Sequence, residues 1–270
     1  MSDRTTRENE RQEPVLDRLY VLPGGWMDMA EKWLVQGGGD KQISVPMPYF
    51  LIEGQGRRIL VDVGCNPLVA TDAAAVWGKG VAAAYQPRIG EEDQLRSRLG
   101  SLDLEPSDIT DVLLTHMHMD HAGGLQLFPH AKIWVQRREH RWAMSPDGFA
   151  RAGYIKDDID RPELEYTLLD GDGEIYPGLY VVNTPGHTPG HQSVLLQLPE
   201  SGWLCLVGDA VYTRKILTRR RMPGVVWGTE ETIASASRLE LLDRAFGVRL
   251  IFNHDAGEYE DLPKAPDCFA

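Results

Sequence analysis

The residues best suited to chemistry gather in the stretch THMHMDHAGG at 115–124. It places His116, His118, Asp120 and His121 within six consecutive positions, directly after the apolar run VLL. Neutral imidazole is a common metal ligand, whereas protonated imidazoles repel one another. A single histidine is most often a surface group or a hydrogen-bonded core residue, but three histidines and an aspartate in one short stretch need a common partner. Two glycines follow instead of a polar repeat, which argues against a solvated histidine-rich tract.

Three further ligand-type residues stand at the ends of other apolar runs. His187 follows LYVVNTPG, Asp209 ends WLCLVGD, and His254 lies near the end of VRLIFNHD. Strands of one sheet end close together, and the loops after strands often carry catalytic groups on a rigid scaffold. We therefore expect segments that are distant in the chain to deliver these side chains to one shared site.

The number of donors points to two metal ions. A catalytic zinc takes about three protein ligands plus water, so this set is too large for one ion and suits two ions that share a carboxylate. Two neighbouring metals can jointly activate a water molecule and polarise the bond that it attacks. The mixed nitrogen and oxygen ligands suit Zn²⁺, with iron, manganese and cobalt left open. The donors are His116, His118, Asp120, His121, His187, Asp209 and His254.

Strands dominate the elements that must position these donors. Short runs rich in β-branched and aromatic residues, bounded by turn residues, predict strands. Helical spacing of leucine and other apolar residues predicts helices at 91–102 and 230–247. Together they predict sheets with helices on their outer faces. The strand-like runs are 19–22, 48–53, 58–64, 111–116, 131–136, 179–186, 191–199, 203–211 and 248–255.

The composition is that of an ordinary globular protein. With 270 residues and 42% hydrophobic residues, the chain can build one sizeable core. We expect a single domain over 15–270, preceded by a disordered polar tail at 1–14. The alanine-rich segment 70–85 is expected to form a buried helix, with a flap over a ligand as the alternative.

Charge and cysteine usage exclude several classes of function. The net charge of −12 disfavours nucleic-acid binding, and the basic run 219–221 is expected to be a solvated loop. No stretch reaches the roughly 20 apolar residues of a membrane span, and the polar N-terminus is unlike a signal peptide. The three cysteines show no CxxC spacing, so we expect free thiols and a cytoplasmic location.

Four motifs together resemble the metallo-β-lactamase superfamily. They are HMHMDH at 116–121, TPGHTPGH at 184–191, GDAVYT at 208–213 and NHD at 253–255. Their order and spacing match that family, and the resemblance implies an α/β (α+β) fold, a four-layer αββα sandwich with a metal site at the edge of its sheets. The segments LYVLPGG, VDVGCNP and VQRRE, with a tyrosine three residues after Asp209, are most similar to the quorum-quenching N-acyl-homoserine lactonases.

This resemblance implies the role of each site residue. His116, His118 and His187 would hold one metal, Asp120, His121 and His254 the other, and Asp209 would bridge them. The implied reaction opens a small-molecule lactone by attack of a hydroxide held between the metals. Tyr212 would donate a hydrogen bond to the substrate, and Asp120 would pass a proton to the departing oxygen. A homodimer is left open.

Residues near the motifs have less specific interpretations. His191 is read as structural, and His130 and His140 as surface or packing residues. Asp62 and Asp255 either orient ligand imidazoles or form turns. Ordinary core is the expectation for Trp26, Met27, Met29 and Trp33, with a pocket wall as the alternative, and Met119 would be a flexible apolar contact.

Three other functions remain as rivals. The same site could act on another lactone, an ester, a thioester or a phosphoester. The scaffold could also carry iron and oxidise its substrate, or bind metal without turnover. The acidic net charge weakens the RNA phosphodiesterase alternative, and the short chain after His254 leaves no room for the extra helical domain of a glyoxalase II-like thioesterase.

Overall fold

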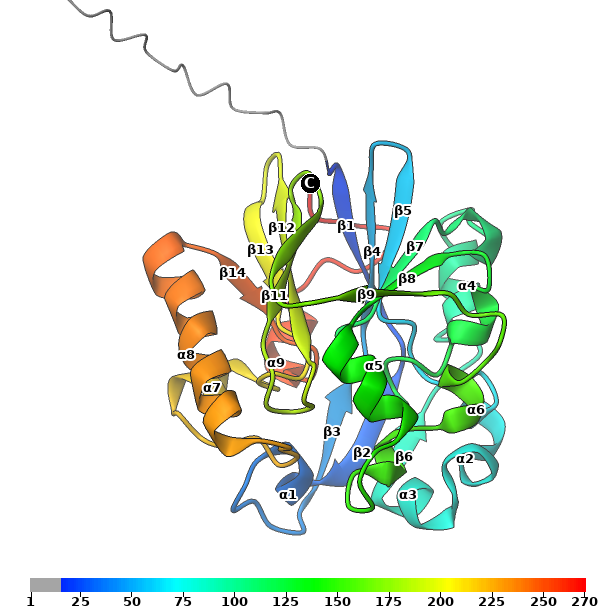
Figure 1. The fold of residues 1–270 in the computed structure, drawn as a ribbon, viewed down its shortest axis with the longest axis vertical. Coiled ribbons are helices and arrows are strands. Elements are labelled where there is room, and N and C mark those ends of the chain that lie inside the picture. The colour runs from blue at the N-terminus through cyan, green and yellow to red at the C-terminus, as the bar shows by residue number, and fades with distance from the viewer. Residues whose placement is uncertain (1–15) are drawn as a thin grey trace, which may run out of the picture.

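Two β-sheets packed face to face form the centre of the molecule. The structure is a computed structural model and describes residues 16–270, so the expected tail at 1–14 lies outside the described residues. Figure 1 shows the two sheets side by side, with α8 and α7 outside one of them and α4, α5 and α6 outside the other. This αββα arrangement confirms the predicted fold class.

The first sheet mixes antiparallel and parallel strands. Its N-terminal strands pair antiparallel, and β5, β7, β8 and β9 run parallel, as strands joined by helical crossovers do. In sheet order the strands are β1 (Arg18–Leu22), β4 (Tyr49–Gly54), β5 (Arg57–Val61), β7 (Asp111–Leu113), β8 (Lys132–Gln136) and β9 (Tyr166–Leu169).

The second sheet is an antiparallel meander closed by one parallel strand. Strands β10 to β13 follow one another along the chain, and β14 joins β13 in parallel after the long helix α8. In order they are β10 (Gly173–Tyr176), β11 (Leu179–Asn183), β12 (Gln192–Leu198), β13 (Gly202–Leu206) and β14 (Arg249–Ile251).

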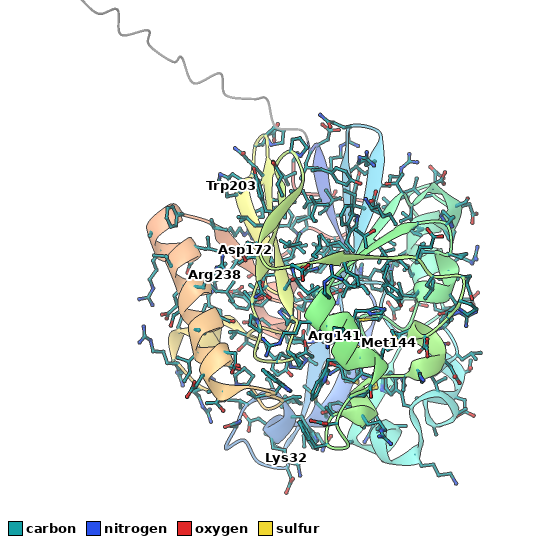
Figure 2. The ribbon with its side chains drawn as sticks, viewed as in Figure 1. Lys32, Arg141, Met144, Asp172, Trp203 and Arg238 are labelled. Carbon is teal, nitrogen blue, oxygen red and sulfur yellow. The ribbon has the colours of Figure 1, made fainter. Side chains whose placement is uncertain are left out.

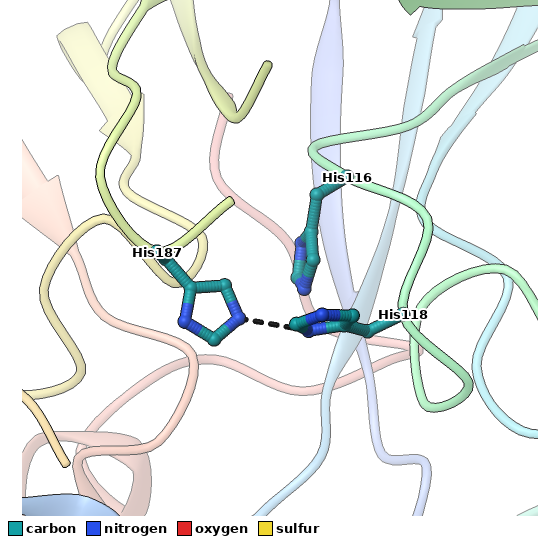
Figure 3. A group of neighbouring side chains, drawn as sticks. All are labelled: His116, His118 and His187. Atoms are coloured by element: carbon teal, nitrogen blue, oxygen red, sulfur yellow. Dashed lines mark hydrogen bonds between the residues drawn. The ribbon is translucent and has the colours of Figure 1, made fainter. Parts of the chain in front are cut away.

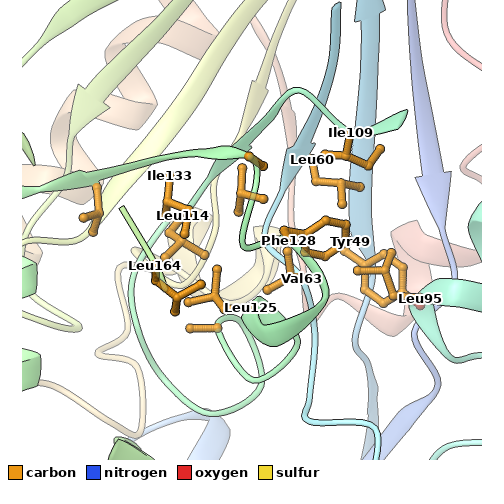
Figure 4. Close-up of a cluster of buried hydrophobic side chains, with 14 of the residues drawn as sticks. Tyr49, Leu60, Val63, Leu95, Ile109, Leu114, Leu125, Phe128, Ile133 and Leu164 are labelled. Carbon is orange, nitrogen blue, oxygen red and sulfur yellow. The ribbon is translucent and has the colours of Figure 1, made fainter. Parts of the chain in front are cut away.

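Period-two alternation of side chains assigns residues to the layers. On β4, Phe50 and Ile52 belong to the apolar layer between the two sheets, whereas Tyr49 and Leu51 face the helices on the other side. Figure 4 shows the helix-facing cluster, in which Leu95 of α4 lies beside Tyr49. A third apolar cluster covers the outer face of the second sheet, where Leu239 of α8 is fully buried.

The helices are mostly short, and α4 to α8 lie on the outer faces of the two large sheets. Figure 2 shows Arg238 of α8 next to Asp172, and this ion pair ties the outer helix to the start of the second sheet. The helices are α1 (Glu31–Leu34), α2 (Val69–Trp77), α3 (Lys79–Ala84), α4 (Leu95–Gly100), α5 (Arg137–Met144), α6 (Lys156–Ile159), α7 (Arg214–Thr218), α8 (Thr229–Phe246) and α9 (Ala256–Glu260), with 3₁₀ turns at Pro106–Asp108, Leu125–Leu127 and Arg151–Gly153.

A small third sheet lies at the end of the molecule that carries the histidine loops. Its order is β3 (Gln42–Pro46), β2 (Trp26–Ala30) and β6 (Tyr85–Arg88). Figure 1 shows it below the two large sheets, beside α2 and α3. Within residues 16–270, no helix has the length and apolar character needed to cross a bilayer.

The sequence predicted the central elements and missed peripheral ones. All nine predicted strands are present, several of them shorter than their apolar runs, and both predicted helices form at α4 and α8. The expectation of a buried helix at 70–85 is wrong: the segment forms α2, α3 and the start of β6, and within it Trp77 is buried while the other side chains are half-buried or exposed. Alanine lowers the cost of helix formation wherever the segment lies, so its abundance did not indicate burial.

Candidate metal centre

The HMHMDH stretch forms a loop because β7 ends at Leu113 and the following backbone is tied to Asp62. The Thr115 N–H donates to Asp62 Oδ1 at 2.8 Å, and the Thr115 hydroxyl donates to Asp62 Oδ2 at 2.9 Å. Asp62 follows β5 and has a positive φ of 61°, which aims its carboxyl across to the neighbouring strand end. The loop is thereby fixed at the edge of the first sheet.

Three histidines form the first donor group. His116 and His118 come from this loop, and His187 comes from the turn between β11 and β12 of the second sheet. One ring nitrogen from each lies within 4.8 Å of the others. Figure 3 shows the three rings converging, with His187 Nε2 2.9 Å from His118 Nδ1. The loops of the two sheets therefore meet here.

A second donor group lies beside the first. Asp120, His121 and His254 also place one ligand atom each within 4.8 Å of one another. Asp209 lies in the loop after β13 and faces both groups: its Oδ2 lies 3.5 Å from His187 Nε2, and its Oδ1 lies 3.4 Å from His121 Nε2. The structure thus brings together all seven residues that the sequence singled out as donors.

Several of these polar atoms are buried without a partner. His116 Nε2, His121 Nε2 and Asp209 Oδ1 accept or donate no hydrogen bond within the described protein. A buried polar group without a partner is costly, and the great majority of such groups are satisfied. Unpartnered nitrogen and carboxylate atoms that converge on common points are the donor set that divalent metal ions bind, so the residues fit a two-metal site.

The electrostatics also favour a cation. Burial opposes a positive charge on His121, yet the carboxylates of Asp209 and Asp120 raise the pKa of its imidazole to about 10. Burial and the neighbouring imidazoles lower the pKa of His116 well below its usual value. Burial opposes the negative charge of Asp209, but the facing imidazoles hold its pKa well below the usual range. The centre therefore attracts positive charge while His116 keeps a free lone pair.

Contacts behind the rings fix which nitrogen faces the centre. His121 Nδ1 lies 2.8 Å from Asp62 Oδ2, and His254 Nδ1 lies 2.8 Å from the carbonyl of Pro46 at the end of β3. A ring that donates from Nδ1 presents the lone pair of Nε2 to the centre. Asp62 thus orients an imidazole, which is one of its two sequence interpretations.

Other residues considered from the sequence lie outside the donor groups. His191 is buried, with Nδ1 2.9 Å from Thr184 Oγ1, and its Nε2 accepts the Asp209 N–H, which supports its structural interpretation. Asp255 caps α9 and accepts the N–H of Arg214 at 2.9 Å. His130 is exposed, and His140 packs against the ring of Tyr166.

A cavity of about 460 Å³ opens onto the donor groups. Its walls are mostly apolar and come from the small sheet, from α3, and from the segment after α5. Met27, Met29 and Trp33 line it, so the pocket-wall alternative applies to them, while Trp26 packs against Tyr259. The remaining lining includes Val45, Val81, Tyr85, Met119, Trp142, Phe149, Tyr154, Tyr212, Val226 and Trp227.

Sequence reasoning missed Glu139, which is fully buried beneath the histidine loops. It follows two arginines at the start of α5, a setting typical of a solvent-exposed helix face. Its only signal was membership in the VQRRE segment.

Comparison with known proteins shows the family of the chain. The family model of the metallo-beta-lactamase superfamily matches residues 48–252. The chain belongs to this superfamily. The N-acyl homoserine lactonase AttM of Azorhizobium caulinodans is 36% identical over 256 residues, covering 92% of this chain and 97% of the relative. The N-acyl homoserine lactonase AiiA of Bacillus thuringiensis subsp. kurstaki is 32% identical over 252 residues, covering 93% and 98%. Within the superfamily, the chain is a member of the N-acyl homoserine lactonase family, as its motifs predicted.

Solved structures of this lactonase family share the architecture. An N-acyl homoserine lactone hydrolase with the product N-hexanoyl-L-homoserine bound at its catalytic metal centre matches with a TM-score of 0.86 at 28% identity, covering 94% of this chain and 100% of that one. A variant of AiiA from B. thuringiensis with N-decanoyl-L-homoserine at its active site matches with the same values. The two solved structures therefore carry acyl products of different length on the fold that this lactonase-family chain adopts.

Proposed function

We propose that this protein hydrolyses the ester bond of N-acyl-homoserine lactones and so opens the lactone ring. The observation that carries the proposal is the convergence of two metal-donor groups on one apolar cavity. The donor groups would hold the metal ions that hydrolysis requires, and the apolar walls would contact an acyl chain. The family membership and the products bound to relatives support the same substrate class.

The two donor groups would hold two divalent ions. His116, His118 and His187 would bind one, and Asp120, His121 and His254 the other, with Asp209 facing both. Such ions, when bound, lower the pKa of water and polarise an ester carbonyl. We propose Zn²⁺ because imidazole and carboxylate ligands suit it.

Tyr212 would donate a hydrogen bond to the substrate. His187 Nδ1 lies 3.2 Å from both the Val225 carbonyl oxygen and Tyr212 Oη. A histidine that binds through Nε2 carries its proton on Nδ1, so Nδ1 donates to these oxygens and the Tyr212 proton stays available. Burial raises the pKa of Tyr212 well above its usual value, so the hydroxyl is neutral and can donate to the carbonyl or the ring oxygen.

Asp120 would pass a proton to the departing oxygen. Its side chain is partly exposed to the cavity that Tyr212 also lines. An alkoxide is a poor leaving group, and a positioned carboxyl that returns a proton to it lowers the barrier. After ring opening, acid and alcohol remain in one molecule, so a single product leaves the cavity.

A pH-stat assay on the zinc-loaded protein tests the function. The panel contains N-acyl-homoserine lactones of several lengths, simple aliphatic lactones, thioesters and phosphoesters. We expect kcat/KM for acyl-homoserine lactones to stand well above the other classes. Equal rates across the classes contradict the assignment, and so does a single bound iron with oxygen consumption.

The variant Asp209→Ala tests the proposed bridge. Because Asp209 faces both donor groups, we expect loss of both metals and of lactone hydrolysis. Metal content and turnover are measured together, with the exposed Asp267→Ala as the control that keeps both. If Asp209→Ala still hydrolyses lactones, Asp209 does not act as the bridge between the two metal ions.

The cellular setting belongs to the same proposal. Cys65, Cys205 and Cys268 are free thiols, a pattern typical of a reducing compartment. On this ground we propose a cytoplasmic location.

A further inference from the structure

A fully buried carboxylate connects the two histidine loops from behind. Glu139 lies in the first turn of α5, on the first sheet's side of the molecule, and its side chain has no exposed surface. The loop of His116 and His118 follows the first sheet, whereas the turn of His187 belongs to the second. The two sides of the first donor group therefore come from different sheets and need a link.

Each oxygen of Glu139 holds one of these loops. Oε1 accepts the N–H of Met117 at 3.0 Å, and Oε2 accepts the N–H of Gly190 at 3.1 Å. Met117 stands between His116 and His118 in the chain. Gly190 closes the turn that carries His187, and a β-carbon there would lie 2.1 Å from the Glu139 backbone nitrogen. The approach between helix and turn is thus as close as glycine permits.

Two hydroxyl groups complete the set of donors. Thr188 Oγ1 donates to Oε2 at 2.6 Å, and Tyr154 Oη donates to Oε1 at 3.2 Å. The ring of Tyr154 packs against His118 with centroids 4.8 Å apart. Burial raises the pKa of the Glu139 carboxyl, while the four donors oppose that rise because they stabilise its charged form.

We propose that Glu139 is a positioning residue that sets the spacing of His118 and His187 and thereby the affinity of the first donor group for its metal. The proposal rests on the two-metal site of the proposed function. The second donor group has separate supports, Asp62 behind His121 and the Pro46 carbonyl behind His254. Glu139 therefore acts on one of the two ions.

The substitution Glu139→Gln removes one of the two backbone hydrogen bonds of Glu139 with little change of side-chain volume. Whichever way the amide lies, its NH₂ group faces the backbone N–H of either Met117 or Gly190, and a backbone N–H cannot become an acceptor. One histidine loop therefore loses its anchor. Gln192 still joins the loops, since its N–H donates to the Thr115 carbonyl and its Nε2 to the Leu114 carbonyl, so we expect the variant to fold.

The test is zinc release from the loaded protein into chelators of graded strength, with no substrate present. Partners behind metal ligands typically change affinity by about 10- to 100-fold, so we expect one zinc of Glu139→Gln to leave at about tenfold lower chelator strength while the other is retained. The exposed Glu200→Gln is the matched control and keeps both ions as the unaltered protein does. A merely structural role would release both ions together.

The outcomes separate the two proposals. If the unaltered protein holds fewer than two ions, the proposed function fails. If it holds two and Glu139→Gln releases them unchanged, or both equally early, only the positioning role is overturned. If Glu139→Gln shows no cooperative thermal transition, Glu139→Asp replaces it in the chelator assay. This variant keeps the negative charge, but its side chain is shorter by one methylene group. Selective weakening of one ion supports the proposal, and its absence overturns it.

Discussion

At the scale of single residues, the proposed role of Tyr212 depends on how its hydroxyl group is shared with His187. With His187 bound to a metal through Nε2, the Tyr212 oxygen would accept from His187 Nδ1, 3.2 Å away, and its proton would be available in the cavity. We expect Tyr212→Phe to keep both metals and its KM but to lose kcat on the order of 10²-fold, the usual effect of removing one donor to a developing negative charge. Steady-state kinetics on metal-quantified protein measure this, and an unchanged kcat would exclude a catalytic hydroxyl.

Asp158 gives a prediction for pH. Burial raises the pKa of its carboxyl to about 6, although Asn66 Nδ2 donates to Oδ1, and its Oδ2 has no partner within the described chain. Between the unfolded value near 3.8 and the folded value near 6, the folded state holds the proton more tightly. Ionisation of this carboxyl therefore lowers the stability of the folded state. The loss grows as the pH rises through this window and persists above it.

The variant Asp158→Asn removes that cost. We expect its melting temperature to exceed that of the unaltered protein at pH 7.5 and to match it more closely at pH 4.5. Both proteins are melted after chelator treatment, so that metal release does not contribute. The exposed Asp267→Asn controls for a general charge effect. A larger gain at pH 4.5 than at pH 7.5 would contradict the sign of this effect.

At the scale of elements, the start of α8 and the two residues before it support the turn that carries His187. The N–H groups of Trp227 and Gly228 donate to the Gly186 carbonyl, and Ser235 Oγ donates to the Pro185 carbonyl at 2.7 Å. Gly186 has a φ of 141°, and a β-carbon there would lie 2.4 Å from Thr232 Oγ1. This glycine is required both by its backbone conformation and by the close approach of the helix.

Substitution of Gly186 tests this support. We expect Gly186→Ala to lose at least about 2 kcal/mol of unfolding free energy, because backbone strain and a clash with α8 act together. We also expect weaker metal binding. The control is Gly247→Ala, whose φ is 65° but whose β-carbon would meet nothing within 4 Å, so it keeps metal affinity and loses only about 1 kcal/mol for the left-handed conformation. The unfolding free energies are measured by denaturant unfolding. Equal losses for Gly186→Ala and Gly247→Ala would show that the clash with α8 adds nothing.

The elements also show what the sequence could and could not predict. Central strands such as β4 are continuous apolar runs buried on both faces, so they were recognisable. Strand β2, WMDMA, interrupts its apolar residues with Asp28, which pairs with Arg88 of β6, and such a strand depends on partners that are distant in the chain. Glu139 was missed for a related reason, because burial of a carboxylate becomes visible only when the four donors that satisfy it are assembled.

For the molecule as a whole, the donors divide between the two large sheets. The loop with His116 and His121 follows the first sheet, whereas His187, Asp209 and His254 follow strands of the second. Each donor group therefore takes ligands from both sheets. Bound ions would cross-link the sandwich at this edge and would stabilise the folded state, because the unfolded chain does not hold these side chains together.

This division predicts how thermal stability depends on zinc. Once free zinc exceeds the dissociation constants, each tenfold increase adds about 1.4 kcal/mol per ion, so two ions should raise the melting temperature by roughly 5 °C or more per decade for a chain of this size. Calorimetry of chelator-treated protein across buffered zinc concentrations measures the slope. His130→Ala, which removes an exposed histidine, should keep it. Asp209→Ala should reduce this slope. An unchanged slope in that variant would mean that zinc stabilises the protein by binding at a different site.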